Sequence, residues 1–133
     1  MQDEELTRFA CALRDANTLE VGDNMHILSF DQKSHFPNDE KCRSCLLVRD
    51  FYPLLFDRIA TLKASLLTGV PGTGKSWWIW YAIQRLLNQE PHPAIVWESS
   101  RRNINKCVLF KDGKAFVGPI TAFDEELRQK STW

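Results

Sequence analysis

Residues 69–78, GVPGTGKSWW, have the residue types and the spacing of a phosphate-binding loop. Gly69 is followed by four residues and then by Gly74, Lys75 and Ser76, which is the Walker A pattern. Glycines adopt backbone conformations that other residues avoid, so successive N–H groups can point at phosphate oxygens. Lys75 would contact the β- and γ-phosphates, and the Ser76 hydroxyl would ligate Mg²⁺. We therefore expect a nucleoside triphosphate to bind here with Mg²⁺, with ATP preferred and GTP as the alternative. The expected contact residues are Gly69, Val70, Pro71, Gly72, Thr73, Gly74, Lys75, Ser76 and Trp77.

The elements on either side of the loop support this interpretation. Residues 65–68 have the character of a short buried strand, and the sequence predicts a helix over 75–88, whose N-terminus would face the phosphates. This helix is apolar nearly all round, which is typical of a buried helix. Its aromatic residues are then expected in the core rather than in a base-stacking site: Trp77, Trp78, Trp80 and Tyr81. The alternative is a structural glycine turn that binds no nucleotide.

Hydrolysis would also require an acid that helps to hold Mg²⁺ at the end of an apolar strand. Glu98 ends the run AIVWE, and Asp124 and Glu125 end the run ITAFDE. The second pair is expected in a helix instead, because Thr121-x-x-Asp124 is close to a capping box and helix formers follow it. The catalytic residues therefore stay unassigned, with these three acids as the candidates.

Two of the four cysteines, Cys42 and Cys45, have the spacing of a metal-ligand pair. His26 and His35 lie upstream at irregular distances. A zinc site needs four ligands at recognisable spacings, so two reduced thiols in a loop are the preferred interpretation.

The composition is that of an ordinary globular domain. The chain has 133 residues with 17 basic and 17 acidic side chains, so its net charge of zero gives it no overall attraction for nucleic acid or an anionic membrane. Neither a signal peptide nor a membrane-spanning run is apparent, which predicts a cytoplasmic protein. Other predicted elements are helices over 3–16, 52–61 and 121–130, strands over 94–98, 103–110 and 115–118, and a hairpin turn at Asp112-Gly113. Residues 17–45 are expected to be irregular, with 25–30 as a candidate strand.

The flanks of the loop carry a family resemblance. The stretches VRDFYPLLFDRI (48–59) and SLLTGVPGTGKSWWIWYAIQRLL (65–87) resemble the NTPase region of crinkler effectors of oomycetes and fungi, which are related to retrotransposon hot spot proteins. The similar region runs from about Val48 to Trp133. In that family the Walker B strand follows the segment that matches 123–133. The resemblance therefore implies a fragment truncated before Walker B, with weak or no hydrolysis, of a secreted effector that acts in the host cell or its nucleus.

Together these observations predict an α/β fold. Residues 61–133 would form a partial P-loop NTPase domain with a short, mostly parallel sheet, flanking helices and a C-terminal hairpin. Residues 1–60 would form a helical and irregular N-terminal extension. An incomplete sheet would leave an edge or an apolar face exposed, which favours self-association or a protein partner. The alternative function is accordingly a non-catalytic, effector-like interaction protein that uses the fold as a scaffold.

Overall fold

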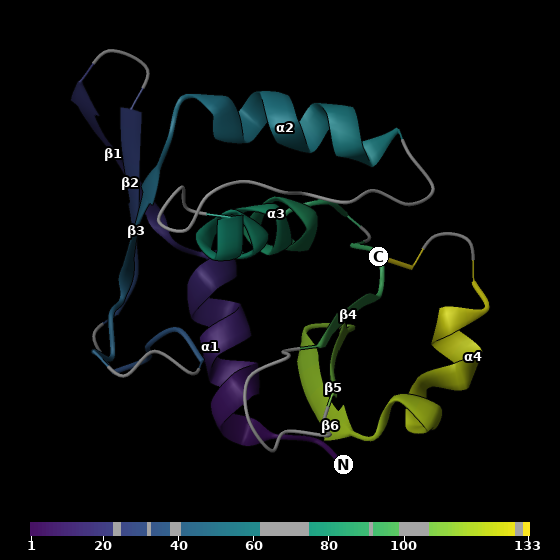
Figure 1. The fold of residues 1–133 in the computed structure, drawn as a ribbon. Helices are drawn as coiled ribbons and strands as arrows, with labels where there is room; N and C mark the ends of the chain where they lie inside the picture. The colour runs from purple at the N-terminus through teal and green to yellow at the C-terminus, as the bar shows by residue number, and fades with distance from the viewer. Residues whose placement is uncertain are drawn as a thin grey trace.

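The computed structural model describes residues 1–22, 25–31, 33–37, 41–61, 75–90, 92–98, 107–129 and 132–133. The elements in chain order are α1 (Glu4–Arg14), β1 (Asn17–Gly22), β2 (Met25–Ser29), β3 (Cys45–Val48), α2 (Phe51–Ala60), α3 (Lys75–Leu87), β4 (Ile95–Glu98), β5 (Cys107–Lys111), β6 (Lys114–Gly118), the 3₁₀ helix η1 (Ile120–Phe123) and α4 (Asp124–Leu127). The described strands form two three-stranded sheets, β1-β2-β3 and β4-β5-β6, which lie on opposite sides of α3 (Figure 1).

The prediction of a mostly parallel sheet, as in a P-loop NTPase core, is wrong. Every strand pair in the described part of the chain is antiparallel. Residues 99–106, which join β4 to β5, are too few for the crossover of a dozen or more residues that parallel neighbours require. A two-residue turn joins β5 to β6, and these two strands are also antiparallel. The strand expected over 65–68 lies outside the described residues.

Several elements predicted from local sequence patterns are confirmed. Helices α1, α2 and α3 lie where the sequence predicts helices, and β4, β5 and β6 follow the predicted strands. The Asp112-Gly113 turn is also confirmed, with φ of 53° and 76°, which matches the type I′ geometry that suits a hairpin. The prediction of irregular structure over 17–45 is wrong for β1, which pairs with the candidate strand β2. All six residues of β1 are exposed, so burial does not distinguish its two faces, although Leu19 and Val21 alternate with Thr18 and Glu20 in the sequence.

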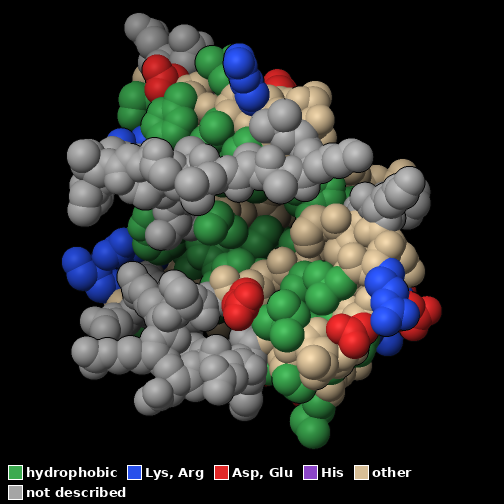
Figure 2. All heavy atoms as spheres, turned by 45° about the vertical axis from the view of Figure 1, so that its right-hand side comes forward, with side chains coloured by type: hydrophobic (Ala, Val, Ile, Leu, Met, Phe, Trp, Pro, Cys, Tyr) green, Lys and Arg blue, Asp and Glu red, His purple; other side chains and the backbone are tan. Residues whose placement is uncertain are grey.

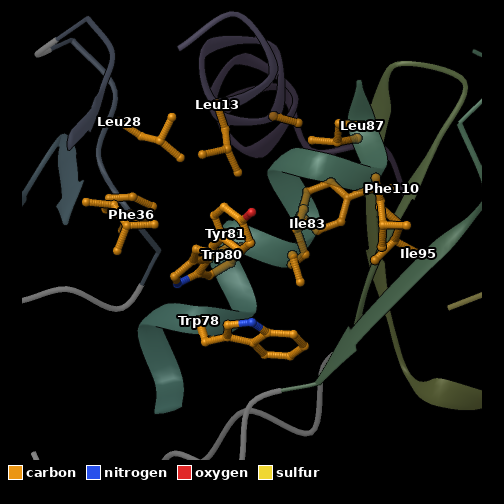
Figure 3. Close-up of a cluster of buried hydrophobic side chains, with 14 of the residues drawn as sticks. Leu13, Leu28, Phe36, Trp78, Trp80, Tyr81, Ile83, Leu87, Ile95 and Phe110 are labelled. Carbon is orange, nitrogen blue, oxygen red and sulfur yellow. The ribbon is translucent and has the colours of Figure 1, made fainter. Parts of the chain in front are cut away.

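Helix α3 occupies the centre of the molecule. Figure 3 shows Leu28 and Phe36 on one side of this helix and Ile95 and Phe110 on the other. The predicted core role of the aromatic residues is confirmed for three of them, since Trp78, Trp80 and Tyr81 are all buried. Both sheets and helices α1 and α2 therefore share a single hydrophobic cluster with α3.

The first residues of the chain are joined to the last sheet. The Asp3 N–H donates to the carbonyl of Ala115 at 2.8 Å, and the Val117 N–H donates to the carbonyl of Met1 at 2.8 Å. The Thr7 hydroxyl accepts from the Ala115 N–H at 2.9 Å. Helix α1 thus packs directly on β6. The division into an extension (1–60) and a domain (61–133) stays a prediction, although both parts contribute to the same core.

We expect the Phe36→Ala variant to lose about 3–5 kcal/mol of unfolding free energy. Phe36 is fully buried, and its ring centroid lies 5.1 Å from that of Trp77 and 5.2 Å from that of Phe30. Urea denaturation would measure the loss. The control is Leu54→Ala on α2, where the side chain is 72% exposed and the change should stay within about 0.5 kcal/mol. Similar midpoints for the two variants would contradict this account of the core.

A second stability prediction concerns the β5–β6 turn. Gly113→Ala should destabilise the protein by roughly 1–2 kcal/mol, because a Cβ is strained at φ +76° even though no atom lies within 4 Å of it. Gly22→Ala is the matched control, since its surroundings are equally open and its φ is not in the left-handed region. Thermal unfolding of both variants would test this. Equal melting temperatures would show that the turn conformation is not what requires glycine.

Candidate phosphate-binding site at the start of helix α3

Part of the predicted loop is described. Gly69 to Gly74 lie outside the described residues. Helix α3 begins at Lys75, so Lys75 and Ser76 stand in its first turn, where a phosphate-binding loop requires them. Trp77 follows in the same turn and is half-buried. The structure thus confirms that the glycine pattern leads directly into a helix.

Contacts with earlier parts of the chain hold the start of α3. The indole Nε1–H of Trp78 donates to the backbone carbonyl of Tyr52 at 3.3 Å, which joins α3 to the first turn of α2. The ring of Trp77 packs edge-on against Phe36. The guanidinium carbon of Arg43 lies 5.4 Å from the centroid of the Trp77 ring, within the range of a cation–π interaction.

A hollow of about 170 Å³ opens beside this first turn. It is lined by Arg43, Cys45, Leu46, Leu47, Arg49, Tyr52 and Trp77. Two of these described side chains are arginines and none is acidic. The volume is below the roughly 300 Å³ at which pockets for whole small molecules begin, so the hollow fits one chemical group rather than an entire nucleotide.

Tyr52 and Arg49 influence each other electrostatically inside this hollow. Burial raises the pKa of the Tyr52 phenol, and the positive charge of Arg49 partly opposes that rise. Tyr52 therefore remains protonated at neutral pH. Because its pKa is raised on folding, its contribution to stability is complete below the ordinary tyrosine pKa and is lost as the pH rises through the folded-state value.

The three candidate acids are not among the residues that line the hollow. Asp124 and Glu125 are exposed in the first turn of α4, so the expectation of a helix at these two acids is confirmed, although α4 covers only 124–127 after the 3₁₀ turn of η1 and no side chain caps it. Helix α4 lies on the opposite side of the molecule from β3, whose residues line the hollow (Figure 1). Glu98 is exposed at the end of β4, opposite Cys107 in the β5 register. Burial, with a smaller effect of Glu98, raises the pKa of the Cys107 thiol.

The cysteine and histidine residues do not assemble into a described metal centre. Cys42 and Cys45 are free and exposed. Within the ranges that the structure describes, no group of three or more His, Cys, Asp or Glu side chains is arranged to hold a metal ion. Nor does any helix in those ranges have the length and hydrophobicity needed to cross a bilayer.

Charge on the rest of the surface is mixed. On the face drawn in Figure 2, the described acidic and basic side chains are scattered, with hydrophobic side chains between them. This distribution agrees with the net charge of zero. The presence of two arginines in one hollow is a local feature of this surface.

Sequence reasoning missed Arg43 and Arg49. A signal was present, because Arg43, Cys45, Leu47 and Arg49 alternate along an extended segment whose intervening Leu46 and Val48 are buried. Nothing local, however, shows that this segment lies beside residue 77. That proximity comes from the packing of β3 and α2 against α3.

Comparison with known proteins adds no relative: no family model, no curated protein and no solved structure matches the chain. The resemblance to crinkler-type NTPases accordingly stays a prediction. What the site can do follows from its own residues.

The proximity of Arg49 to Tyr52 can be tested by titration. Arg49→Gln should raise the pKa of Tyr52 further, because the variant removes the charge that opposes the effect of burial. The chain has two tyrosines, so a Tyr81→Phe background leaves Tyr52 as the only phenol to follow by ultraviolet absorbance. Arg58→Gln, on the exposed end of α2, is the control and should leave the titration unchanged. An unchanged Tyr52 titration in Arg49→Gln would place the arginine elsewhere.

Proposed function

We propose that this chain binds a nucleoside triphosphate together with Mg²⁺ at residues 69–77, with ATP preferred and GTP as the alternative. The observation that carries the proposal is the position of the helix start. The Gly-x-x-x-x-Gly-Lys-Ser pattern ends in the first turn of α3, beside a hollow with two arginines. A helix N-terminus and nearby cations both favour an anionic ligand.

A magnesium–triphosphate group is the ligand that we propose for this helix start. In the proposed complex, Lys75 contacts the β- and γ-phosphates, and the Ser76 hydroxyl helps to hold Mg²⁺. The metal would neutralise part of the phosphate charge. The role of the chain itself is to present backbone N–H groups and cations to the phosphates from a helix whose start is fixed by packing.

Weak or absent hydrolysis is part of this proposal. Asp124 and Glu125 lie on α4, on the other side of the molecule from β3, and Glu98 is not among the residues that line the hollow. A bound triphosphate would therefore meet cations from the described lining but no carboxylate to help hold the metal. The resemblance to crinkler-type NTPases also supports the proposal that the chain binds a nucleotide.

Lys75→Ala should weaken binding of Mg²⁺–ATP by about tenfold or more, the cost of one charge-assisted contact with phosphate. Equilibrium binding of ATP and GTP to the wild type and the variant would measure this, with phosphate release followed in the same samples. Lys114→Ala on the exposed side of β6 is the control for loss of one positive charge. Equal affinity of wild type and Lys75→Ala would refute the proposal. Lysine-dependent phosphate release at an ordinary enzymatic rate would refute only the part that concerns hydrolysis.

A second candidate function, that of an interaction protein, is favoured by one feature. The register places Leu19, Ile27 and Leu47 side by side on the face of the β1-β2-β3 sheet that points away from the core. Leu19 is 63% and Leu47 41% exposed. An apolar row of this kind is typical of a surface that another protein covers. Absence of nucleotide binding by the folded wild type would favour this candidate.

A further inference from the structure

We propose that the last described residues form a strap that opens while the rest of the protein stays folded, and that this opening gives access to the buried thiol of Cys107. The strap consists of residues 119–129, which contain η1 and α4, together with residues 132–133. Residues 130–131, which join these two parts, lie outside the described residues. The proposal is independent of nucleotide binding at residues 69–77.

The two faces of the β4-β5-β6 sheet belong to different hydrophobic clusters, because alternate residues of a strand point in opposite directions. One face contributes to the main core around α3. The opposite face forms a smaller cluster with Phe123 of η1, whose sheet members include Val96, Cys107, Leu109 and Phe116. Figure 1 shows α1 and α4 on opposite sides of this sheet. Opening of the strap would therefore uncover the smaller cluster and leave the main core in place.

Phe123 covers the end of this face at which Cys107 lies. Cys107 is paired with Gly118 in the β5–β6 register. A Cβ added at Gly118 would lie 3.4 Å from the Cβ of Ala122 and 3.8 Å from the Cζ of Phe123, so η1 lies directly over this pair of strands. Cys107 is only 2% exposed. Displacement of Phe123 is thus the movement that would uncover the thiol.

Few described contacts hold the middle of the strap closed. Phe123 is the only buried residue in 119–129, and Leu127 is 44% exposed. Helix α4 is a single turn without a side-chain cap. The Lys111 Nζ donates to the Glu126 Oε1 at 3.5 Å, and a partly exposed ion pair of this kind contributes little stability. A segment with so few buried contacts opens at a lower free-energy cost than the whole domain.

The other end of the strap is attached to the edge of β4. The Trp133 N–H donates to the carbonyl of Ala94 at 2.9 Å, and the Val96 N–H donates to the carbonyl of Trp133 at 2.8 Å. Trp133 is therefore hydrogen-bonded to β4 like one residue of an added strand. Its ring stacks on Phe56 of α2, with the ring centroids 5.7 Å apart and the planes 1° from parallel. Loss of the Trp133 ring should shift the strap toward its open form.

The test measures how fast N-ethylmaleimide alkylates Cys107 in the native protein, with each cysteine followed by peptide mass spectrometry. Cys42 and Cys45 are exposed and report the rate for an accessible thiol. We expect Trp133→Ala to accelerate alkylation of Cys107 roughly tenfold, because it removes an aromatic pair together with its buried area.

A second variant with a matched control tests the ion pair. Glu126→Gln should accelerate alkylation of Cys107 roughly two- to fivefold, because it removes the contact with Lys111. Glu125→Gln changes the exposed neighbouring acid in the same helical turn and should leave the rate unchanged. If Trp133→Ala does not fold, the comparison of these two variants decides.

Urea separates opening of the strap from unfolding of the whole protein. Opening of the strap exposes little surface, so alkylation of Cys107 should depend only weakly on low concentrations of urea, whereas global unfolding depends steeply on them. Alkylation that follows urea as steeply as unfolding measured by circular dichroism would overturn the proposal. Equal Cys107 rates in Glu126→Gln, Glu125→Gln and the wild type would also overturn it.

Discussion

The burial of α3 on nearly all sides is the constraint on which the rest of the molecule depends. Neither three-stranded sheet shares a described strand pair with the other, and each packs its inner face against this helix or its neighbours. Short sheets of this size need such support, because a few strands alone bury little apolar surface. Trp80 contacts both sides: its ring centroid lies 6.0 Å from that of Phe36, which follows β2, and 4.8 Å from that of Trp97 in β4. A helix held in this way cannot shift along its axis without disturbing both sheets.

The same packing holds the start of α3 against earlier parts of the chain. The Trp78 indole is hydrogen-bonded to Tyr52, and Trp77 is enclosed by Phe36 and Arg43. These contacts fix the first turn of α3 against β3 and α2 before any ligand arrives. The aromatic residues after the glycine pattern thus contribute to binding by position, although they were expected, and found, mainly in the core.

Local patterns in the sequence predicted what depends on local structure. The all-round apolar character of 75–88 indicated a buried helix, and Asp112-Gly113 indicated a hairpin, since both signals lie within a few residues. Strand direction is different in kind, because it depends on which strands meet. The glycine pattern suggested a parallel sheet by analogy, whereas the short connection over 99–106 requires β4 and β5 to be antiparallel. The site divides in the same way: the pattern at 69–76 is local, while the position of Arg43 beside Trp77 depends on tertiary packing.

The charge distribution around the hollow bears on whether the proposed site holds a nucleotide or also cleaves it. Arginines stabilise a bound triphosphate and also the charge that develops during phosphoryl transfer, so their presence alone does not distinguish the two roles. The distinction depends on a carboxylate that helps hold the metal and on a group that orients water. The described lining offers hydrophobic side chains, a thiol and a protonated phenol in those roles. Whether the proposed site also cleaves its ligand is therefore decided by the phosphate-release arm of the Lys75→Ala experiment.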